Sequence, residues 1–142
     1  LGSEKLCLPV DILVAMEAEA GSSTQTVACD AIPDDLVGVD IGAKTVANVI
    51  DLLKEARTIV WNGPMGIFEI PAFARGTEFV AKAVATATKA GAVSIVGGGD
   101  TIAALKKFNL VESVSHASTG GGASLEYLEG KELPGVKALK EK

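Results

Sequence analysis

The sequence contains little of what builds a disulfide framework, a metal cluster or a histidine-based active site. Its 142 residues include two cysteines and one histidine, and aromatic residues make up 4%. Cys7 and Cys29 match no metal-ligand spacing, so we interpret both as small, buried apolar residues. This cysteine usage favours a cytoplasmic location.

Long hydrophobic runs are also absent. No run approaches the roughly 18 apolar residues that a membrane span needs, and no charged and then apolar leader opens the chain. The net charge of −5 offers phosphate groups no overall attraction, so any anion site must be local. We therefore expect neither a membrane nor a nucleic acid as a partner.

Glycine, in contrast, is abundant and clustered. The chain has 16 glycines, and two triplets occupy positions 97–99 and 120–122. Glycine loses more backbone entropy on folding than any other residue. Each triplet therefore indicates either a tight bend or a ligand that lies close to the bare backbone.

Short apolar runs alternate with helical patterns along most of the chain. Residues 57–61, 92–96 and 113–118 are expected strands. Helical spacing marks residues 46–53 and 73–90, and further helices are expected after each glycine triplet, the last one closed by Gly130. This order predicts one α/β domain, a three-layer, Rossmann-like parallel sheet with helices on both faces. The tail after Gly130 is expected to be peripheral.

Three glycine-containing stretches each follow an expected strand and precede an expected helix. They read "NGPMG", "GGGDT" and "STGGGAS". In a parallel sheet such loops lie at the same edge, outside the carboxyl ends of the strands, where α/β sheets bind ligands. Helix N-termini at this edge favour anions, so the sequence predicts a phosphate-binding site there.

Two common nucleotide-binding motifs do not match. A P-loop needs Gly-Lys followed by Ser or Thr, whereas the one Gly-Lys pair, Gly130–Lys131, continues into Glu132. A dinucleotide fingerprint that uses Gly97 and Gly99 finds Ile102 in place of its third glycine. The failed fingerprint disfavours an NAD-type oxidoreductase.

Single polar residues allow more than one interpretation. Asp100 can be the N-cap of the following helix, a magnesium ligand, or both. Glu69 fits a solvated turn residue. His116 in a short strand is more typical of a core residue than of a base. Ser118 and Thr119 are weak candidates for a nucleophile, because the chain has one histidine and no nucleophile-elbow motif.

Longer stretches carry a specific resemblance. The segments "IVWNGPMGIFE", "AFARGT", "SIVGGGDT" and "SHASTGGGASLEYLEGKELPGV" stand in this order, after "LPVD" near the start. Together they resemble the phosphoglycerate kinase family over nearly the whole chain. The match is to the C-terminal part of that two-domain enzyme. It implies that residues 1–142 are a partial C-terminal nucleotide-binding domain, without the N-terminal 3-phosphoglycerate-binding domain and the loop whose lysines reach the nucleotide phosphates.

The resemblance also implies roles for the adenosine end of the site. Gly38, in "VGVD", resembles the glycine beside the adenine. Asn62 and Pro64 resemble the residues near the phosphates and the base. Glu69 resembles the carboxylate that accepts hydrogen bonds from the ribose hydroxyls.

At the phosphate end, the resemblance assigns a nucleotide-binding loop to Gly97, Gly98 and Gly99. Asp100 resembles the ligand of the magnesium–nucleotide complex, with the hydroxyl of Thr101 beside it. Gly120 and Gly121 resemble the residues whose amides face the transferring phosphoryl group.

The implied reaction is reversible phosphoryl transfer in glycolysis. 1,3-Bisphosphoglycerate and Mg-ADP give 3-phosphoglycerate and ATP, with Mg²⁺ as the cofactor, and the complete enzyme is expected to be a monomer. The segment alone is expected to be inactive, because the acyl-phosphate site and the phosphate-binding lysines lie outside it. The alternative is a nucleotide-binding module without turnover of its own.

Overall fold

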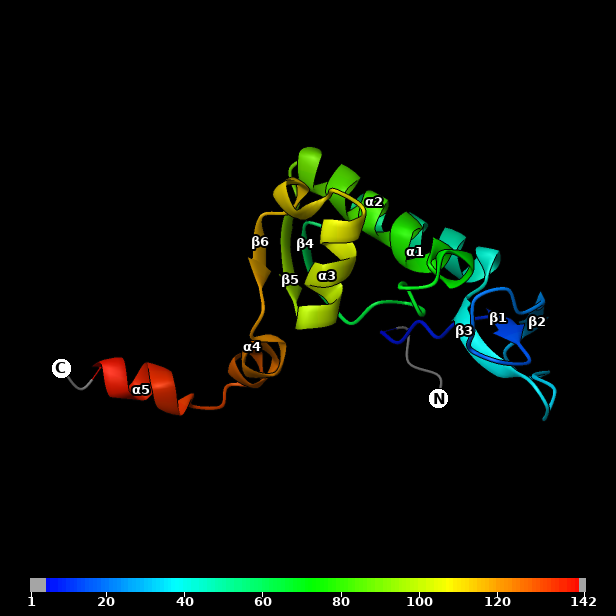
Figure 1. Cartoon of the computed structure of the whole chain (residues 1–142). Coiled ribbons are helices and arrows are strands. Elements are labelled where there is room, and N and C mark those ends of the chain that lie inside the picture. Colours follow the sequence, from blue (N-terminus) through cyan, green and yellow to red (C-terminus); the bar gives the residue numbers. More distant parts are fainter. Residues whose placement is uncertain (1–4, 141–142) are drawn as a thin grey trace.

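The computed structural model describes residues 5–140, which form two small sheets and five α-helices (Figure 1). The elements are, in order, β1 (Asp11–Ala15), β2 (Thr24–Ala28), β3 (Val37–Ile41), α1 (Ala43–Glu55), β4 (Thr58–Asn62), α2 (Arg75–Lys89), β5 (Val93–Gly97), α3 (Gly99–Lys107), β6 (His116–Ser118), α4 (Gly121–Leu128) and α5 (Pro134–Lys140). Two 3₁₀ turns, η1 (Pro71–Phe73) and η2 (Val111–Ser113), precede α2 and β6. None of the helices within residues 5–140 is long and apolar enough to cross a membrane.

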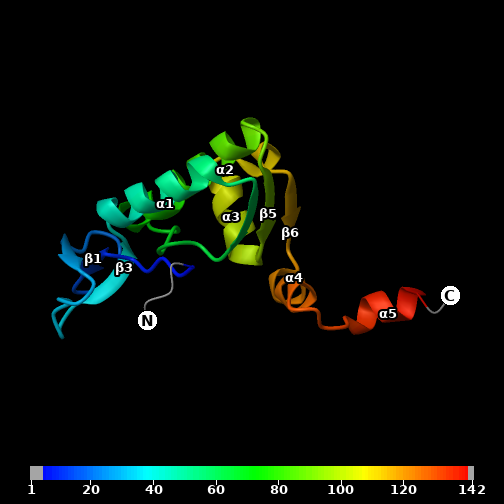
Figure 2. The ribbon, with the colours of Figure 1, turned by 180° about the vertical axis from the view of Figure 1, so that it is seen from behind.

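The second half of the chain forms a parallel sheet in the order β4-β5-β6. Its inward face carries Ile59, Trp61 and Val96, which pack against Val84 of α2 and Leu105 of α3. Helix α1 lies along α2 in both ribbon views (Figures 1 and 2). The predicted α/β class with a Rossmann-like parallel sheet is confirmed.

On the opposite face of this sheet, side chains are exposed within residues 5–140. Val60 is 48% exposed and Val93 is 51% exposed, because strand alternation points them away from α2 and α3. His116 pairs in register with Ile95 and is exposed on this face, so the expectation of a core histidine was wrong.

The first three strands form a separate antiparallel sheet, in the order β2-β1-β3. The connection between β1 and β2 spans residues 16–23 and turns through Gly21 at φ +93°. It is too short for the crossover of about a dozen residues that a parallel pair requires. The interpretation of both cysteines as buried was also wrong: Cys7 is exposed and Cys29, just beyond the edge strand β2, is half-buried.

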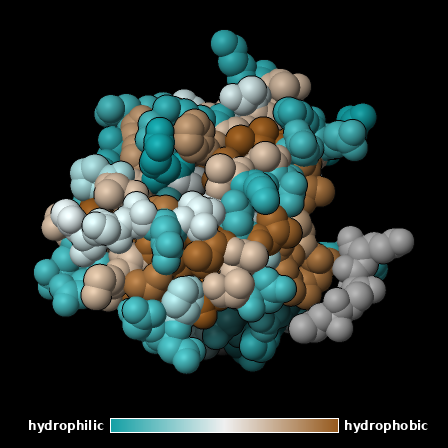
Figure 3. All heavy atoms as spheres, turned by 90° about the vertical axis from the view of Figure 1, so that its right-hand side faces the viewer, coloured by the Kyte–Doolittle hydropathy of each residue, from teal (hydrophilic) through white to brown (hydrophobic). Residues whose placement is uncertain are grey.

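Apolar side chains are exposed around the antiparallel sheet. They include Leu8, Val10, Met16 and Val37. Figure 3 shows apolar residues among polar ones on this side of the molecule. At the other end, α5 projects away from the two sheets (Figures 1 and 2), as expected for a peripheral tail, and its Leu139 is 79% exposed.

The buried Asp11 joins the antiparallel sheet to α1. Its carboxylate accepts hydrogen bonds from the backbone amides of Lys44, at 3.0 Å, and Thr45, at 2.7 Å. The Thr45 hydroxyl donates to the same carboxylate at 2.7 Å. Since Gly42, the N-cap of α1, has no side chain, Asp11 supplies the cap from a strand.

Asp40, on β3, caps the N-terminus of α2. Its carboxylate accepts the backbone N–H of Gly76 at 2.7 Å and that of Ile41 at 2.9 Å. Desolvation by burial raises the pKa of Asp40, and these two hydrogen bonds offset part of that effect. A Cβ on Gly66 or Gly76 would collide with the Asp40 side chain, so the carboxylate occupies space that both glycines leave free.

Candidate functional site

The loops that follow β4, β5 and β6 meet at the carboxyl edge of the parallel sheet, as the strand order predicts. The amide of Gly98 donates to the carbonyl of Ser118 at 3.1 Å. The Asn62 side-chain amide donates to the Gly121 carbonyl at 3.4 Å. The structure therefore brings Asn62 together with both glycine triplets at the N-termini of α3 and α4.

Two of the glycines are required by packing within the protein. Gly98 has φ +95°, and a Cβ there would also lie 2.7 Å from the Asn62 side-chain oxygen. A Cβ on the buried Gly121 would lie 2.7 Å from both the Cα and the amide nitrogen of Gly98. These two residues must be glycine for the loops to approach one another.

Three other glycines have no such requirement. A Cβ on Gly99 or Gly122 would meet no atom within 4 Å, and one on Gly120 would make ordinary contact, at 3.6 Å, with the Ser118 hydroxyl. None of the three has a positive φ. Gly99 and Gly122 are exposed in the first turns of α3 and α4, where backbone N–H groups have no partner within the helix. This edge therefore presents bare, donor-rich backbone to solvent.

Asp100 lies in the first turn of α3 and is exposed. The N-cap of α3 is Gly98, and no side chain caps it, so the capping interpretation of Asp100 was wrong. The positive φ of Gly98 starts the helix before Asp100, which leaves the carboxylate free to face a ligand at the helix N-terminus. Among residues 5–140 no group of three or more His, Cys, Asp or Glu could hold a metal ion. The single exposed carboxylate of Asp100 could offer one oxygen ligand to an ion whose other ligands come from a bound anion.

Thr101 is fully buried, and its hydroxyl accepts the backbone N–H of Gly63 at 2.8 Å. The indole N–H of Trp61 donates to the Gly63 carbonyl at 2.7 Å. α3 thereby fixes the start of the loop over residues 62–69.

The middle of this loop is fixed by α2 and β3. The hydroxyl of the buried Thr77 accepts the amides of Met65 and Gly66, at 3.0 and 3.2 Å. The amide of Ile67 donates to the Val39 carbonyl at 3.0 Å. Sequence reasoning missed Thr77, because a threonine in a helix carries no local signal that it holds a loop.

The residues expected at the adenosine end are more dispersed. Glu69 is exposed in a turn, and Pro64 is half-buried in the loop over residues 62–69. Gly38 lies on β3 of the antiparallel sheet, where its Cα faces the side chain of Ile12. It does not lie at the parallel-sheet edge, but the hydrogen bond between Ile67 and Val39 connects its strand to that loop.

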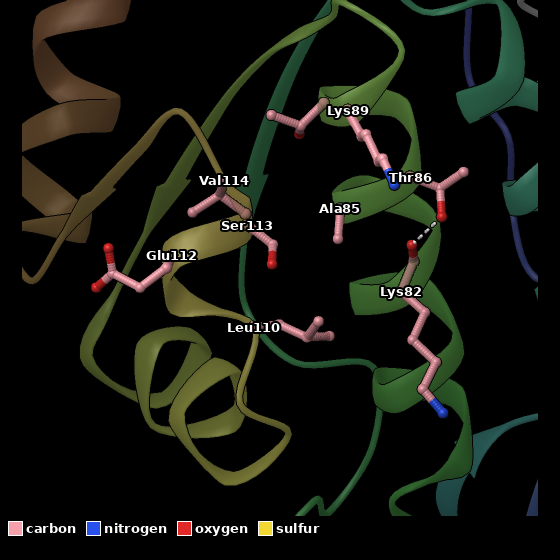
Figure 4. A pocket seen from close by; sticks show the side chains of 9 residues that line it. Lys82, Ala85, Thr86, Lys89, Leu110, Glu112, Ser113 and Val114 are labelled. Atoms are coloured by element: carbon pink, nitrogen blue, oxygen red, sulfur yellow. Dashed lines mark hydrogen bonds between the residues drawn. The ribbon is translucent and has the colours of Figure 1, made fainter.

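A groove of about 670 Å³ lies at the opposite end of the parallel sheet (Figure 4). Its walls are the C-terminal half of α2, with Lys82, Thr86 and Lys89, and the segment after α3, with Leu110 and Glu112. None of the expected site residues lines it. This groove is therefore not the candidate site that the glycine loops form in residues 5–140.

Known proteins match this chain over most of its length. The model of the family "phosphoglycerate kinase" matches residues 2–131. A phosphoglycerate kinase of Mycobacterium sp. (strain KMS) is 59% identical over 133 residues, which cover 93% of this chain and 33% of that protein. One of Rubrobacter xylanophilus is 56% identical over 140 residues, covering 99% of this chain and 35% of that protein.

Solved structures agree. Phosphoglycerate kinase from Coxiella burnetii is 50% identical and superposes with a TM-score of 0.84, over 92% of this chain and 33% of that one. The enzyme from Pyrococcus horikoshii OT3 is 37% identical with a TM-score of 0.78, over 93% and 32%. The chain spans about a third of the length of these relatives. It belongs to the phosphoglycerate kinase family.

Proposed function

We propose that this chain is the nucleotide-binding part of a phosphoglycerate kinase and holds Mg-ADP or Mg-ATP. The observation that carries the proposal is the open edge at Gly99 and Gly122, where glycine is not needed for packing. A ligand that must touch the backbone explains glycine at such positions. Two helix N-termini at the same edge favour a polyanion.

At the phosphate end, backbone amides of the loop over Gly97, Gly98 and Gly99 would bind the nucleotide phosphates. Bound Mg²⁺ would neutralise charge on those phosphates. The Asp100 carboxylate and phosphate oxygens would be its ligands. Amides around Gly120 and Gly121 would face the transferring phosphoryl group and stabilise the charge that spreads over its oxygens. Thr101 would act beside Asp100 by holding Gly63.

At the adenosine end, Gly38 would lie beside the adenine, with Asn62 and Pro64 between the phosphates and the base. The exposed Glu69 carboxylate would accept hydrogen bonds from the ribose hydroxyls. Fixed hydrogen bonds along residues 62–69 support this proposal, because they hold the backbone that carries these side chains.

The complete protein would transfer a phosphoryl group reversibly between 1,3-bisphosphoglycerate and ADP, as in glycolysis, in the cytoplasm and as a monomer. The protein contributes positioning and charge stabilisation, and closure of its two domains would exclude water. The phosphoglycerate would be bound by an N-terminal domain that residues 1–142 do not contain. The second candidate function is nucleotide binding without turnover. We expect this behaviour of residues 1–142 in isolation.

A coupled assay for ATP formation tests the proposal directly. The complete protein, supplied with 1,3-bisphosphoglycerate and Mg-ADP, should form ATP, whereas residues 1–142 alone should not. Nucleotide binding by the isolated chain, measured in parallel, separates a lack of turnover from a lack of binding. Turnover by the isolated chain, free of host enzyme, would contradict the assignment of the phosphoglycerate site to another domain.

A further inference from the structure

The backbone around Glu69 is held by the far end of the helix whose N-terminus faces the phosphate site. Lys107 closes the last turn of α3, and its ammonium donates to the carbonyls of Phe68, at 2.6 Å, and Glu69, at 3.0 Å. At the first turn of the same helix, Thr101 holds Gly63. One rigid helix therefore fixes both ends of the segment over residues 63–69.

Side-chain packing of Phe68 fixes the same end of this segment. Phe68 is 7% exposed and packs against Ala104 of α3 and Ala74. The Phe68 ring anchors the chain next to Glu69, and the Lys107 ammonium sets the direction of the two peptide groups that follow the ring. The Glu69 carboxylate is itself exposed, so its direction depends on the backbone that carries it.

We propose that Lys107 is a positioning residue that orients Glu69 toward the ribose hydroxyls of the nucleotide. The inference rests on the proposed function, in which Glu69 contacts the ribose. Lys107 acts through the Phe68 and Glu69 carbonyls and contacts no reacting atom. Because the loop is half-exposed, water can replace the lost donors in a variant, so the expected effect is on ribose recognition and not on folding.

The chain offers a matched control in the adjacent Lys106. It lies in the same last turn of α3, it is exposed, and no hydrogen bond or ion pair of its ammonium is present among residues 5–140. Lys106→Met and Lys107→Met remove the same charge from the same helix end. Any effect of net charge or of the helix dipole is therefore common to both variants.

The experiment measures the affinities of the complete protein for Mg-ADP and for its 2′,3′-dideoxy analogue. In Lys107→Met we expect the preference for ADP over the analogue to fall roughly tenfold, which is about 1.4 kcal/mol. Binding of the analogue and the melting temperature should stay as in the parent. Lys106→Met should keep the preference, and so should Lys107→Arg, which retains N–H donors.

Suppose that the parent prefers ADP over the analogue and that Glu69→Ala abolishes this preference. An unchanged preference in Lys107→Met would then overturn the role of Lys107 and leave the role of Glu69 intact. An equal loss in Lys106→Met, or a loss in Lys107→Arg as large as in Lys107→Met, would overturn it as well. A parent that binds both nucleotides equally would overturn the ribose role of Glu69 and, with it, the role of Lys107.

Discussion

The glycines at the carboxyl edge of the parallel sheet have different reasons to be glycine. A Cβ on Gly121 would collide with the backbone of Gly98, and a Cβ on Gly98, which has φ +95°, would collide with the side chain of Asn62. Gly99 and Gly122 face open space. Substitutions of Gly98 or Gly121 therefore test packing within the protein, whereas substitutions of Gly99 or Gly122 test the binding of a ligand.

Gly121→Val should therefore destabilise the protein itself. Its Cβ would lie 2.7 Å from the Gly98 backbone, which cannot rotate away as a flexible side chain would. Overpacking of this kind typically costs about 1–3 kcal/mol. Thermal denaturation should show a lower Tm for Gly121→Val and a nearly unchanged Tm for Gly122→Ala. Equal Tm values for Gly121→Val and the parent would mean that the two loops do not pack as described.

Asp100→Asn tests the proposed metal ligand without disturbing the helix. Asp100 is exposed and is not the N-cap of α3, so the variant should melt close to the parent. Mg²⁺ prefers a charged carboxylate oxygen, so the Mg-dependent part of nucleotide affinity should fall strongly. Titrations of ADP with and without Mg²⁺ give the two affinities. A variant with full Mg-dependent affinity would exclude Asp100 as the ligand.

Among the elements, helices α1 and α2 are capped by carboxylates of the antiparallel sheet. Burial raises the pKa of Asp11, but the hydrogen bonds from Thr45 and the Lys44 amide outweigh it and leave the pKa below its ordinary value of 3.8. The folded state thus favours the carboxylate. Its contribution to stability is present above the ordinary pKa and is lost as the pH falls through the lowered folded pKa.

Asp11→Asn should remove this pH dependence. Denaturant unfolding of parent and variant between about pH 3 and pH 6 gives the difference in free energy of unfolding at each pH. That difference should be largest at the upper end of this range and should shrink on acidification. The raised pKa of Asp40 acts in the opposite direction, but it is common to both proteins and cancels in the difference. A difference that does not change with pH would contradict the cap.

Local sequence signals predicted much of the parallel sheet and its helices. The run over residues 57–61 and the spacing of Val46, Val49 and Leu53 gave β4 and α1 nearly as observed. Short-range patterns predict these elements because the local geometry of a strand or a helix sets the spacing of the side chains that it buries. The convergence of the glycine loops followed from strand order alone.

The remaining features depend on contacts between distant residues. The bonds from Asp11 to α1 and from Asp40 to α2 join residues more than thirty positions apart, and no spacing rule reports them. The start of α3 was placed too late because the helix begins after Gly98, whose φ is +95° and whose amide bonds to the distant Ser118 carbonyl. The exposure of His116 likewise reflects which face of the sheet the helices cover.

At the scale of the whole molecule, the chain covers about a third of its relatives. The described residues supply one glycine-lined edge of the proposed nucleotide site. We propose that nucleotide phosphates contact the bare backbone at the N-terminus of α3. Gly99 is the position where this contact is best separated from packing.

The most direct test is the affinity of the complete protein for Mg-ADP, measured by titration calorimetry, in Gly99→Ala. Gly135→Ala is the matched control, because its Cβ would also meet open space and its φ is not positive, but it lies at α5, away from the glycine loops. We predict that Gly99→Ala weakens Mg-ADP binding at least about tenfold, or 1.4 kcal/mol, without lowering the Tm, and that Gly135→Ala changes neither. Binding by Gly99→Ala within about twofold of the parent, about 0.4 kcal/mol, would contradict a phosphate site at this edge.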